Sequence, residues 1–131
     1  MSAALFFITH EGVASNLLKT AEAIVQKPHG NLSYIEVPMD AATDKIDINI
    51  ENKLKQLAID DGIFFITDIY GSTPSNIAQQ LADKYKTHLI TGVNLPMVIR
   101  LLNYRDEPVE TLVQKALEGA CQGIKYISAR H

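Results

Sequence analysis

Residues 3–12 read AALFFITHEG and residues 63–76 read IFFITDIYGSTPSN, and these two stretches decide the fold. In each, a run of apolar residues is followed closely by one ionisable residue, His10 in the first and Asp68 in the second. An uninterrupted apolar run is typical of a strand buried on both faces, as in a parallel sheet. The two stretches therefore predict two core strands, each with a polar group just past its apolar run.

The rest of the chain alternates between strand and helix patterns around these runs. Strands are expected at residues 3–9, 32–37, 63–67 and 87–92, and apolar residues at helical spacing predict helices at 13–27, 47–58, 73–85, 96–104 and 109–121. Thr73 is expected to cap the third helix, with Pro74 at its first position. This order predicts an α/β fold, a doubly wound and mainly parallel sheet with helices on both faces, in a single domain over residues 1–131.

The C-terminal tail has a pattern of its own. Residues 123–128, Gly-Ile-Lys-Tyr-Ile-Ser, alternate like an edge strand. Because this strand stands alone at the end of the chain, it is expected to pair with an edge of this subunit or of another one.

The composition excludes several classes of protein. A chain of 131 residues that is 47% hydrophobic has enough apolar surface for a packed core. Its net charge of −3 gives no basic footprint for nucleic acid or an anionic membrane. No segment is apolar for long enough to span a bilayer, and no positive region precedes the first apolar run as in a secretory signal. Cys121 is the single cysteine, so there is no internal disulfide, and we expect a cytoplasmic protein.

His10 and Asp68 are the candidate catalytic residues. If their strands are neighbours, the two side chains meet at the switch point of the sheet, where α/β proteins bind ligands. Imidazole can accept and release a phosphoryl group through one ring nitrogen, and a carboxylate that accepts the other N–H fixes the tautomer. The alternatives are that His10 is a structural histidine and that Asp68 only forms a turn.

Gly71, Ser72 and Thr73 are the candidate phosphate-binding residues. Small residues let the backbone approach an anion, and free amides at a helix start point toward it. The start of the first helix, near Glu11–Val13, is expected to add further amides, although the carboxylate of Glu11 would repel a phosphate. The alternative for Thr73 is plain helix capping.

Several motifs are missing from the sequence. There is no P-loop, no G-x-G-x-x-G, no H-E-x-x-H, no cysteine–histidine cluster and no G-x-S-x-G. We therefore expect no nucleotide-using kinase, no cofactor and no metal. Residues 91–97, TGVNLPM, are expected to form another wall of the crevice, with Leu95 and Met97 as an apolar surface for a partner or as part of a turn.

Three motifs together carry a family resemblance. Thr9-His10, residues 67–76 (TDIYGSTPSN) and residues 91–97 resemble the mannose-type IIA component of the bacterial phosphoenolpyruvate:sugar phosphotransferase system in order and approximate spacing. The resemblance covers nearly the whole chain. One departure is Glu11, which stands where the family often has glycine directly after the histidine.

The resemblance implies a function and partners. His10 matches the phosphorylated histidine, Asp68 matches the aspartate that bonds its other nitrogen, and Thr73 falls near the phosphate with Ser72 in the small position before it. The protein would accept phosphate from the phosphocarrier protein HPr and pass it to a IIB component. It would be a homodimer in which the C-terminal strand crosses to the partner subunit.

Two other functions use the same residues. A regulatory protein that responds to its phosphorylation state, without driving sugar uptake, would need the same site. A receiver-like domain would be phosphorylated on Asp68, but it would carry an acidic pair where this chain has Thr9-His10.

Overall fold

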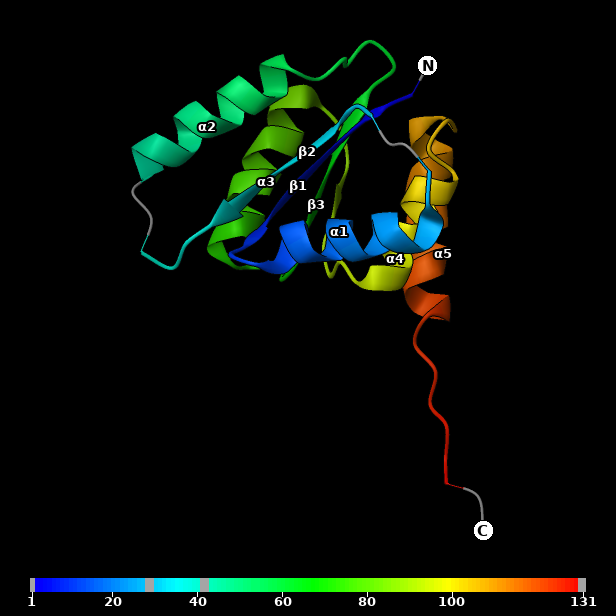
Figure 1. Ribbon diagram of the computed structural model, residues 1–131. Coiled ribbons are helices and arrows are strands. Elements are labelled where there is room, and N and C mark those ends of the chain that lie inside the picture. Colours follow the sequence, from blue (N-terminus) through cyan, green and yellow to red (C-terminus); the bar gives the residue numbers. More distant parts are fainter. Residues whose placement is uncertain (1, 28–29, 41–42, 130–131) are drawn as a thin grey trace.

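A computed structural model of the protein describes residues 2–27, 30–40 and 43–129. Strands and helices alternate along the chain (Figure 1). The strands are β1 (Ala4–His10), β2 (Leu32–Val37), β3 (Ile63–Thr67) and β4 (Leu89–Ile90). The helices are α1 (Val13–Val25), α2 (Thr43–Lys55), α3 (Thr73–Tyr85), α4 (Leu95–Asn103) and α5 (Val109–Gln122).

The strands form one parallel sheet in the order β2-β1-β3-β4. On β1, Ile8 faces Ile35 of β2 on one side and Thr67 of β3 on the other. The chain leaves β1 toward β2 and then crosses to β3 on the other side, so the switch point lies between the carboxyl ends of β1 and β3. The predicted doubly wound fold is confirmed.

Helices cover both faces of this sheet (Figure 1), and a hydrophobic core lies between the sheet and each helix layer. Leu5 and Phe7 of β1 belong to the core beneath α1, α4 and α5, whereas Phe6 and Ile8 belong to the core beneath α2 and α3. Successive side chains of a strand point to opposite faces, so a strand between two helix layers must be apolar at every position. This explains the continuous apolar run that predicts β1.

Some predicted boundaries are wrong by a few residues. β4 comprises only Leu89–Ile90 instead of residues 87–92, because only these two residues pair with β3. α1 ends at Val25 because Gln26 adopts a left-handed conformation and its amide caps the carbonyl of Glu22. α2 begins at Thr43 rather than at residue 47.

The cap of α3 is also different from the prediction. Ser72 is the N-cap, with an extended backbone and a side chain that accepts a hydrogen bond from the amide of Ser75, and Thr73 is the first helical residue. The preceding Gly71 has a φ of 85°, so the chain turns there and enters the helix one residue earlier than expected.

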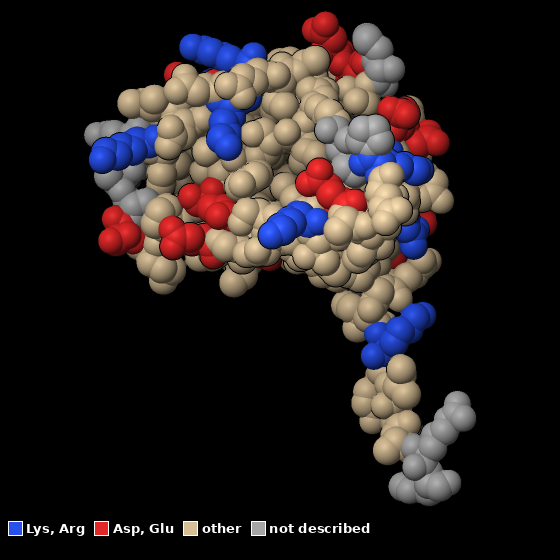
Figure 2. Space-filling view, viewed as in Figure 1, with Lys and Arg blue, Asp and Glu red and all other residues tan. Residues whose placement is uncertain are grey.

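The C-terminal tail is not a strand in this structure. After α5 the chain runs away from the body of the protein, and the side chains of Ile124, Tyr126 and Ile127 are 73%, 92% and 83% exposed (Figures 1 and 2). The prediction of an edge strand at 123–128 is therefore wrong for the single chain. A strand needs a partner for its backbone groups, and the described part of this chain supplies none there.

Charged side chains of both signs are interspersed on the face seen in Figure 2. Among the described residues, the helices are all too short or too polar to cross a bilayer.

Candidate active site

His10 and Asp68 meet at the carboxyl edge of the sheet, as predicted. His10 is the last residue of β1, and Asp68 directly follows β3, the neighbouring strand. Their side chains are 29% and 10% exposed, so the imidazole reaches solvent while the carboxylate is mostly covered. The site is therefore open to a reactant on the histidine side.

One oxygen of Asp68 binds His10 twice. Its Oδ2 lies 2.8 Å from Nδ1 of His10 and accepts a hydrogen bond of 2.9 Å from the backbone amide of His10. The other oxygen, Oδ1, accepts a hydrogen bond of 2.9 Å from the amide of Ile69. The carboxylate is thus held by two strand ends, and it fixes both the backbone and the ring of His10.

The charge of Asp68 determines the tautomer of His10. Burial acts to raise the pKa of Asp68. The overall pKa is nevertheless lowered from its ordinary value, because Asp68 accepts hydrogen bonds from the amide and ring of His10 and from the amide of Ile69, and because of the charge of His10. An ionised carboxylate can only accept, so Nδ1 must carry the hydrogen in this pair. Whenever the ring carries a single hydrogen, Nε2 therefore has a lone pair.

A cavity of about 230 Å³ adjoins the ring of His10. Thr73 at the start of α3 lines it together with His10, and the remaining lining is formed by Val37, Pro38, Met39, Ile46, Pro74 and Ile77. Mostly apolar residues around His10 and Thr73 thus enclose a space that a small group could occupy beside the histidine. Among the described residues, no three histidine, cysteine or acidic side chains lie together in a way that could hold a metal ion.

The three predicted phosphate-binding residues lie together, but their side chains differ in what they contact. Thr73 is exposed and lines the cavity with His10. Ser72 donates its hydroxyl hydrogen to the carbonyl of Ile69 at 2.6 Å and accepts from the amide of Ser75 at 3.4 Å. The amide of Gly71 donates to Oγ of Ser75 at 3.3 Å. Of Ser72 and Thr73, Thr73 is the one that lines the cavity beside the histidine.

The start of α3 is suited to an anion. Its first turn contains no acidic residue, and its cap is a neutral hydroxyl. The positive end of the helix dipole therefore faces the edge of the sheet without a compensating negative charge on the helix itself.

The start of α1 differs, and sequence reasoning missed the residue responsible. The amide of Ala14 donates to Oγ1 of Thr9 at 3.0 Å, and the amide and hydroxyl of Ser15 both donate to Oε2 of Glu36, at 2.8 and 2.7 Å. Burial acts to raise the pKa of Glu36, but the hydrogen bonds from Ser15 and from the amide of Gly12 lower that pKa overall. Much of this helix start is therefore occupied by groups of the protein, contrary to the expectation that it adds amides for a phosphate.

The loop after β4 packs against the strand end that carries Asp68, but contrary to expectation none of residues 91–97 lines the cavity beside His10. The amide of Gly92 donates to the carbonyl of Asp68 at 2.8 Å, and the amide of Val93 donates to the carbonyl of Thr67 at 3.2 Å. Met97, however, is only 1% exposed and packs in the core, so it offers no surface to a partner. Its amide donates to Oδ1 of the N-cap Asn94 at 3.0 Å, and its side chain lies on the face of α4 that packs on the core.

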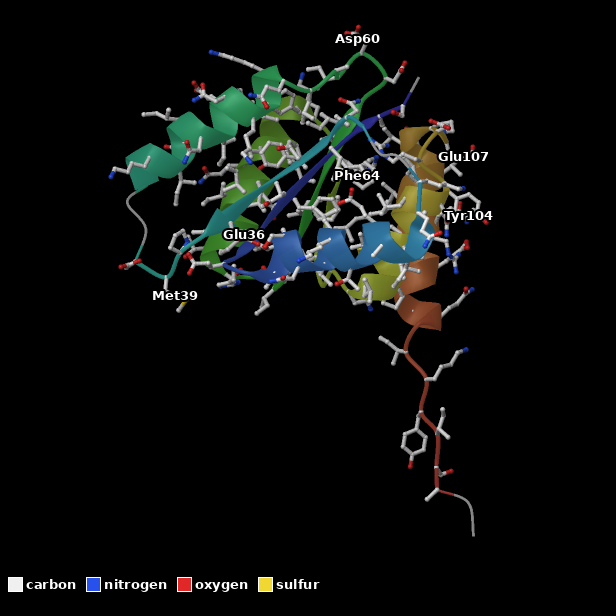
Figure 3. The ribbon with its side chains drawn as sticks, in the orientation of Figure 1. Glu36, Met39, Asp60, Phe64, Tyr104 and Glu107 are labelled. Carbon is white, nitrogen blue, oxygen red and sulfur yellow. The ribbon has the colours of Figure 1, made fainter. Side chains whose placement is uncertain are left out.

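Exposed apolar side chains do occur next to site residues, but on other loops. Met39, in the link after β2, is 91% exposed, and Ile69 and Tyr70, directly after Asp68, are 61% and 77% exposed. Figure 3 shows Met39 just past the carboxyl end of β2, at the opposite end of the sheet from Asp60. Large apolar groups exposed around a polar site are typical of a surface that docks another protein.

Comparison with known proteins gives consistent matches. The family model EIIA-man, described as the fructose IIA component of the phosphotransferase system, matches residues 4–117. The chain is 33% identical over 134 aligned residues to the mannose-specific EIIAB component of the phosphotransferase system from Escherichia coli, with 99% of this chain and 41% of that protein covered. The chain thus spans about two fifths of the length of this curated relative.

Two solved structures share the fold. The mannose/sorbose-specific IIA subunit from Enterococcus faecalis superimposes with a TM-score of 0.83 at 19% identity, over 100% of this chain and 98% of the other. The component EIIA from Streptococcus agalactiae gives 0.79 at 20% identity, over 95% and 96% of the two chains.

Proposed function

This chain belongs to the EIIA-man family, the mannose-type IIA components of the sugar phosphotransferase system, and we propose that it carries a phosphoryl group on Nε2 of His10. The donor is the phosphocarrier protein HPr and the acceptor is a IIB component, both in the cytoplasm. The observation that supports this most strongly is the 2.8 Å contact between Nδ1 of His10 and Oδ2 of Asp68. It leaves Nε2 as the nucleophilic nitrogen of a partly exposed ring.

The chemical step is a transfer between two nucleophiles. The lone pair of Nε2 forms a bond to the phosphorus while the bond between phosphorus and the donor's nitrogen breaks, and that electron pair stays on the donor. The ring of His10 gains positive charge as the new bond forms. The carboxylate of Asp68 stabilises this charge and keeps Nδ1–H in place. Transfer to the acceptor reverses the step with another nucleophile.

The start of α3 is proposed to hold the phosphoryl oxygens. The hydroxyl and amide of Thr73 and the backbone near Gly71 and Ser72 lie at the uncompensated positive end of this helix. Their hydrogen bonds would orient the group in line with Nε2. They are few, which suits a carrier that must release what it binds.

The partners are proposed to dock on the apolar surface formed by Met39, Ile69 and Tyr70. A small apolar surface around the reacting ring suits brief contact with a donor and an acceptor in turn. Both partners would cover the same histidine, so they bind one after the other.

The assembly is proposed to be a homodimer with exchanged tails. The exposed apolar residues Ile124, Tyr126 and Ile127 lack a partner within the described part of their own chain, and β4 is an edge strand of the sheet. Pairing of the tail with the β4 edge of a second copy would cover both.

The test is phosphorylation of the full chain. The protein is incubated with phosphoenolpyruvate, enzyme I and HPr, and bound labelled phosphate is counted for the wild type, His10→Ala and the control His88→Ala, in which another exposed histidine is removed. We expect label on the wild type and His88→Ala and none on His10→Ala. Label retained on His10→Ala rejects the proposal. Transfer from the labelled wild type to a IIB protein supports the carrier role, and its absence would leave a regulatory role.

A further inference from the structure

Two helices begin close to His10, and the amides of their first turns are bound by different groups. α1 begins at Val13, three residues after His10, and α3 begins at Thr73, five residues after Asp68. The N-cap of α1 is Gly12, which has no side chain to bind the helix amides. Each start has the partial positive charge of a helix N-terminus, and each would attract a phosphoryl group.

At α1 that charge is already balanced by a carboxylate from a different strand. Figure 3 shows Glu36 at the end of β2, beside the first turn of α1. In the sheet, Glu36 pairs with Thr9, one residue before His10. Its Oε2 receives both the amide and the hydroxyl of Ser15, so the contact is well formed and not an incidental approach.

Capping the first turn of α1 does not require a charged side chain. Serine, threonine or asparagine satisfies the amides of a first turn without adding a net charge. The carboxylate also places a full negative charge at the first turn of α1, on a strand residue that pairs with Thr9, the neighbour of His10 in the chain, where it would act on a dianionic phosphoryl group carried by His10. Its effect on that group is repulsion, and it cancels the attraction that the start of α1 would otherwise exert.

We propose that Glu36 is a positioning residue that closes the start of α1 to the phosphoryl group. Glu36 thereby directs the phosphoryl group toward α3. Its charge also destabilises phosphorylated His10, so that the phosphoryl group is readily transferred to the acceptor. This inference rests on the proposed carrier function and deepens it, because it identifies a group that sets the transfer potential. Glu36 acts through α1 and through charge, and it does not contact the reacting atoms.

The direct test is the equilibrium constant for phosphoryl exchange between HPr and this protein. In Glu36→Gln the side chain keeps an acceptor oxygen but loses its charge. We expect the equilibrium constant to move toward the phosphorylated protein by about 3- to 10-fold. This is the size expected when one charge acts on a dianion through partly hydrated surroundings. Transfer onward to the acceptor should slow accordingly. Glu36→Asp keeps the charge and should stay near the wild-type value.

A second variant adds a negative charge on the first turns of α1. Asn16 is exposed in the first turns of α1, where its amide donates to the carbonyl of Gly12 at 2.6 Å. Asn16→Asp replaces this donor with a carboxylate and should move the equilibrium in the opposite direction, away from the phosphorylated protein. This arm keeps the test valid even if Glu36→Gln does not fold. The matched control is Glu22→Gln, which removes an exposed carboxylate near the other end of α1 and should leave the equilibrium unchanged.

The outcomes separate this inference from the proposed function. If the wild type takes no phosphoryl group, the carrier function fails. If the wild type is phosphorylated but Glu36→Gln and Asn16→Asp both match it within error, the charge of Glu36 has no such role and the inference is overturned. An equal shift in Glu22→Gln would also overturn it, because the effect would then be one of overall charge.

Discussion

At the scale of single residues, Asp68 decides what His10 can do. Its Oδ2 accepts from both the backbone and the ring of His10, so a single oxygen fixes the position and the tautomer of the nucleophile. A hydroxyl or an amide in its place would fill the space but would not stabilise the charge that develops on the ring.

We therefore expect Asp68→Asn to slow phosphorylation by at least about 10- to 100-fold, the size found for groups that orient a metal-bound imidazole. The amide keeps the size of the side chain but removes the charge, and it can also donate to Nδ1 and so impose the wrong tautomer. The measurement is the initial rate of labelling from HPr. Asp83→Asn, at an exposed position of α3, is the matched control. A wild-type rate in Asp68→Asn would contradict the assigned role.

The same contact predicts how stability depends on pH. The pKa of Asp68 is lowered in the folded protein, so its stabilising contribution is present above the pKa of the unfolded chain and is lost as pH falls through the folded pKa. We expect the difference in free energy of unfolding between the wild type and Asp68→Asn to be constant above about pH 5 and to shrink below about pH 4. Urea unfolding at pH 7, 5, 4 and 3 measures it. A difference that stays constant down to pH 3 would show that the folded pKa is not lowered.

At the scale of elements, the two helix starts determine the electrostatics of the site. α3 has a neutral cap and α1 is closed by Glu36. The phosphoryl group is therefore expected beside Thr73, on the cavity side of His10.

The cap assignment of α3 can be tested by stability. Ser72→Ala should lower the free energy of unfolding by about 1 kcal/mol, because it removes the oxygen that accepts from the amide of Ser75. Thr73→Ala, one residue later and exposed, should change it by less than about 0.5 kcal/mol. Urea unfolding of both variants gives the comparison. The reverse order of effects would mean that Thr73 is the cap after all.

The sequence was a good guide to the strands and a poorer one to the groups that bind across them. β1 and β3 were predictable because a strand between two helix layers leaves a continuous apolar run, and the meeting of His10 with Asp68 follows once these strands are neighbours. The cap of α3 was predicted one residue late, because Ser72 and Thr73 are both good caps and only the turn at Gly71 decides between them. Glu36 could not be found, because its partner Ser15 lies 21 positions away and nothing local marks the pair.

At the scale of the whole molecule, the tail is the feature that a single chain does not explain. Its apolar side chains are exposed and its backbone extends from α5 away from the sheet (Figure 1). Such a segment is expected to lower the solubility of the protein unless another chain covers it.

We expect removal of the chain from residue 124 onward to convert a dimer into a monomer, because the exposed tail residues are the proposed link between copies. Sedimentation equilibrium of the full and shortened chains gives the two masses. The fold of the shortened protein should persist, since the described tail side chains lie outside both cores. A full chain that sediments as a monomer, or a shortened chain that remains a dimer, would contradict the exchange.

The central claim is that phosphate resides on Nε2 of His10, and locating the group tests it most directly. The protein, labelled with ¹⁵N in its histidines, is phosphorylated through HPr, and coupling between ¹⁵N and ³¹P is recorded by NMR. The account predicts a single coupled nitrogen, Nε2 of His10, with Nδ1 still bearing a hydrogen. Coupling to Nδ1, to another histidine, or to none while phosphate is bound would contradict it.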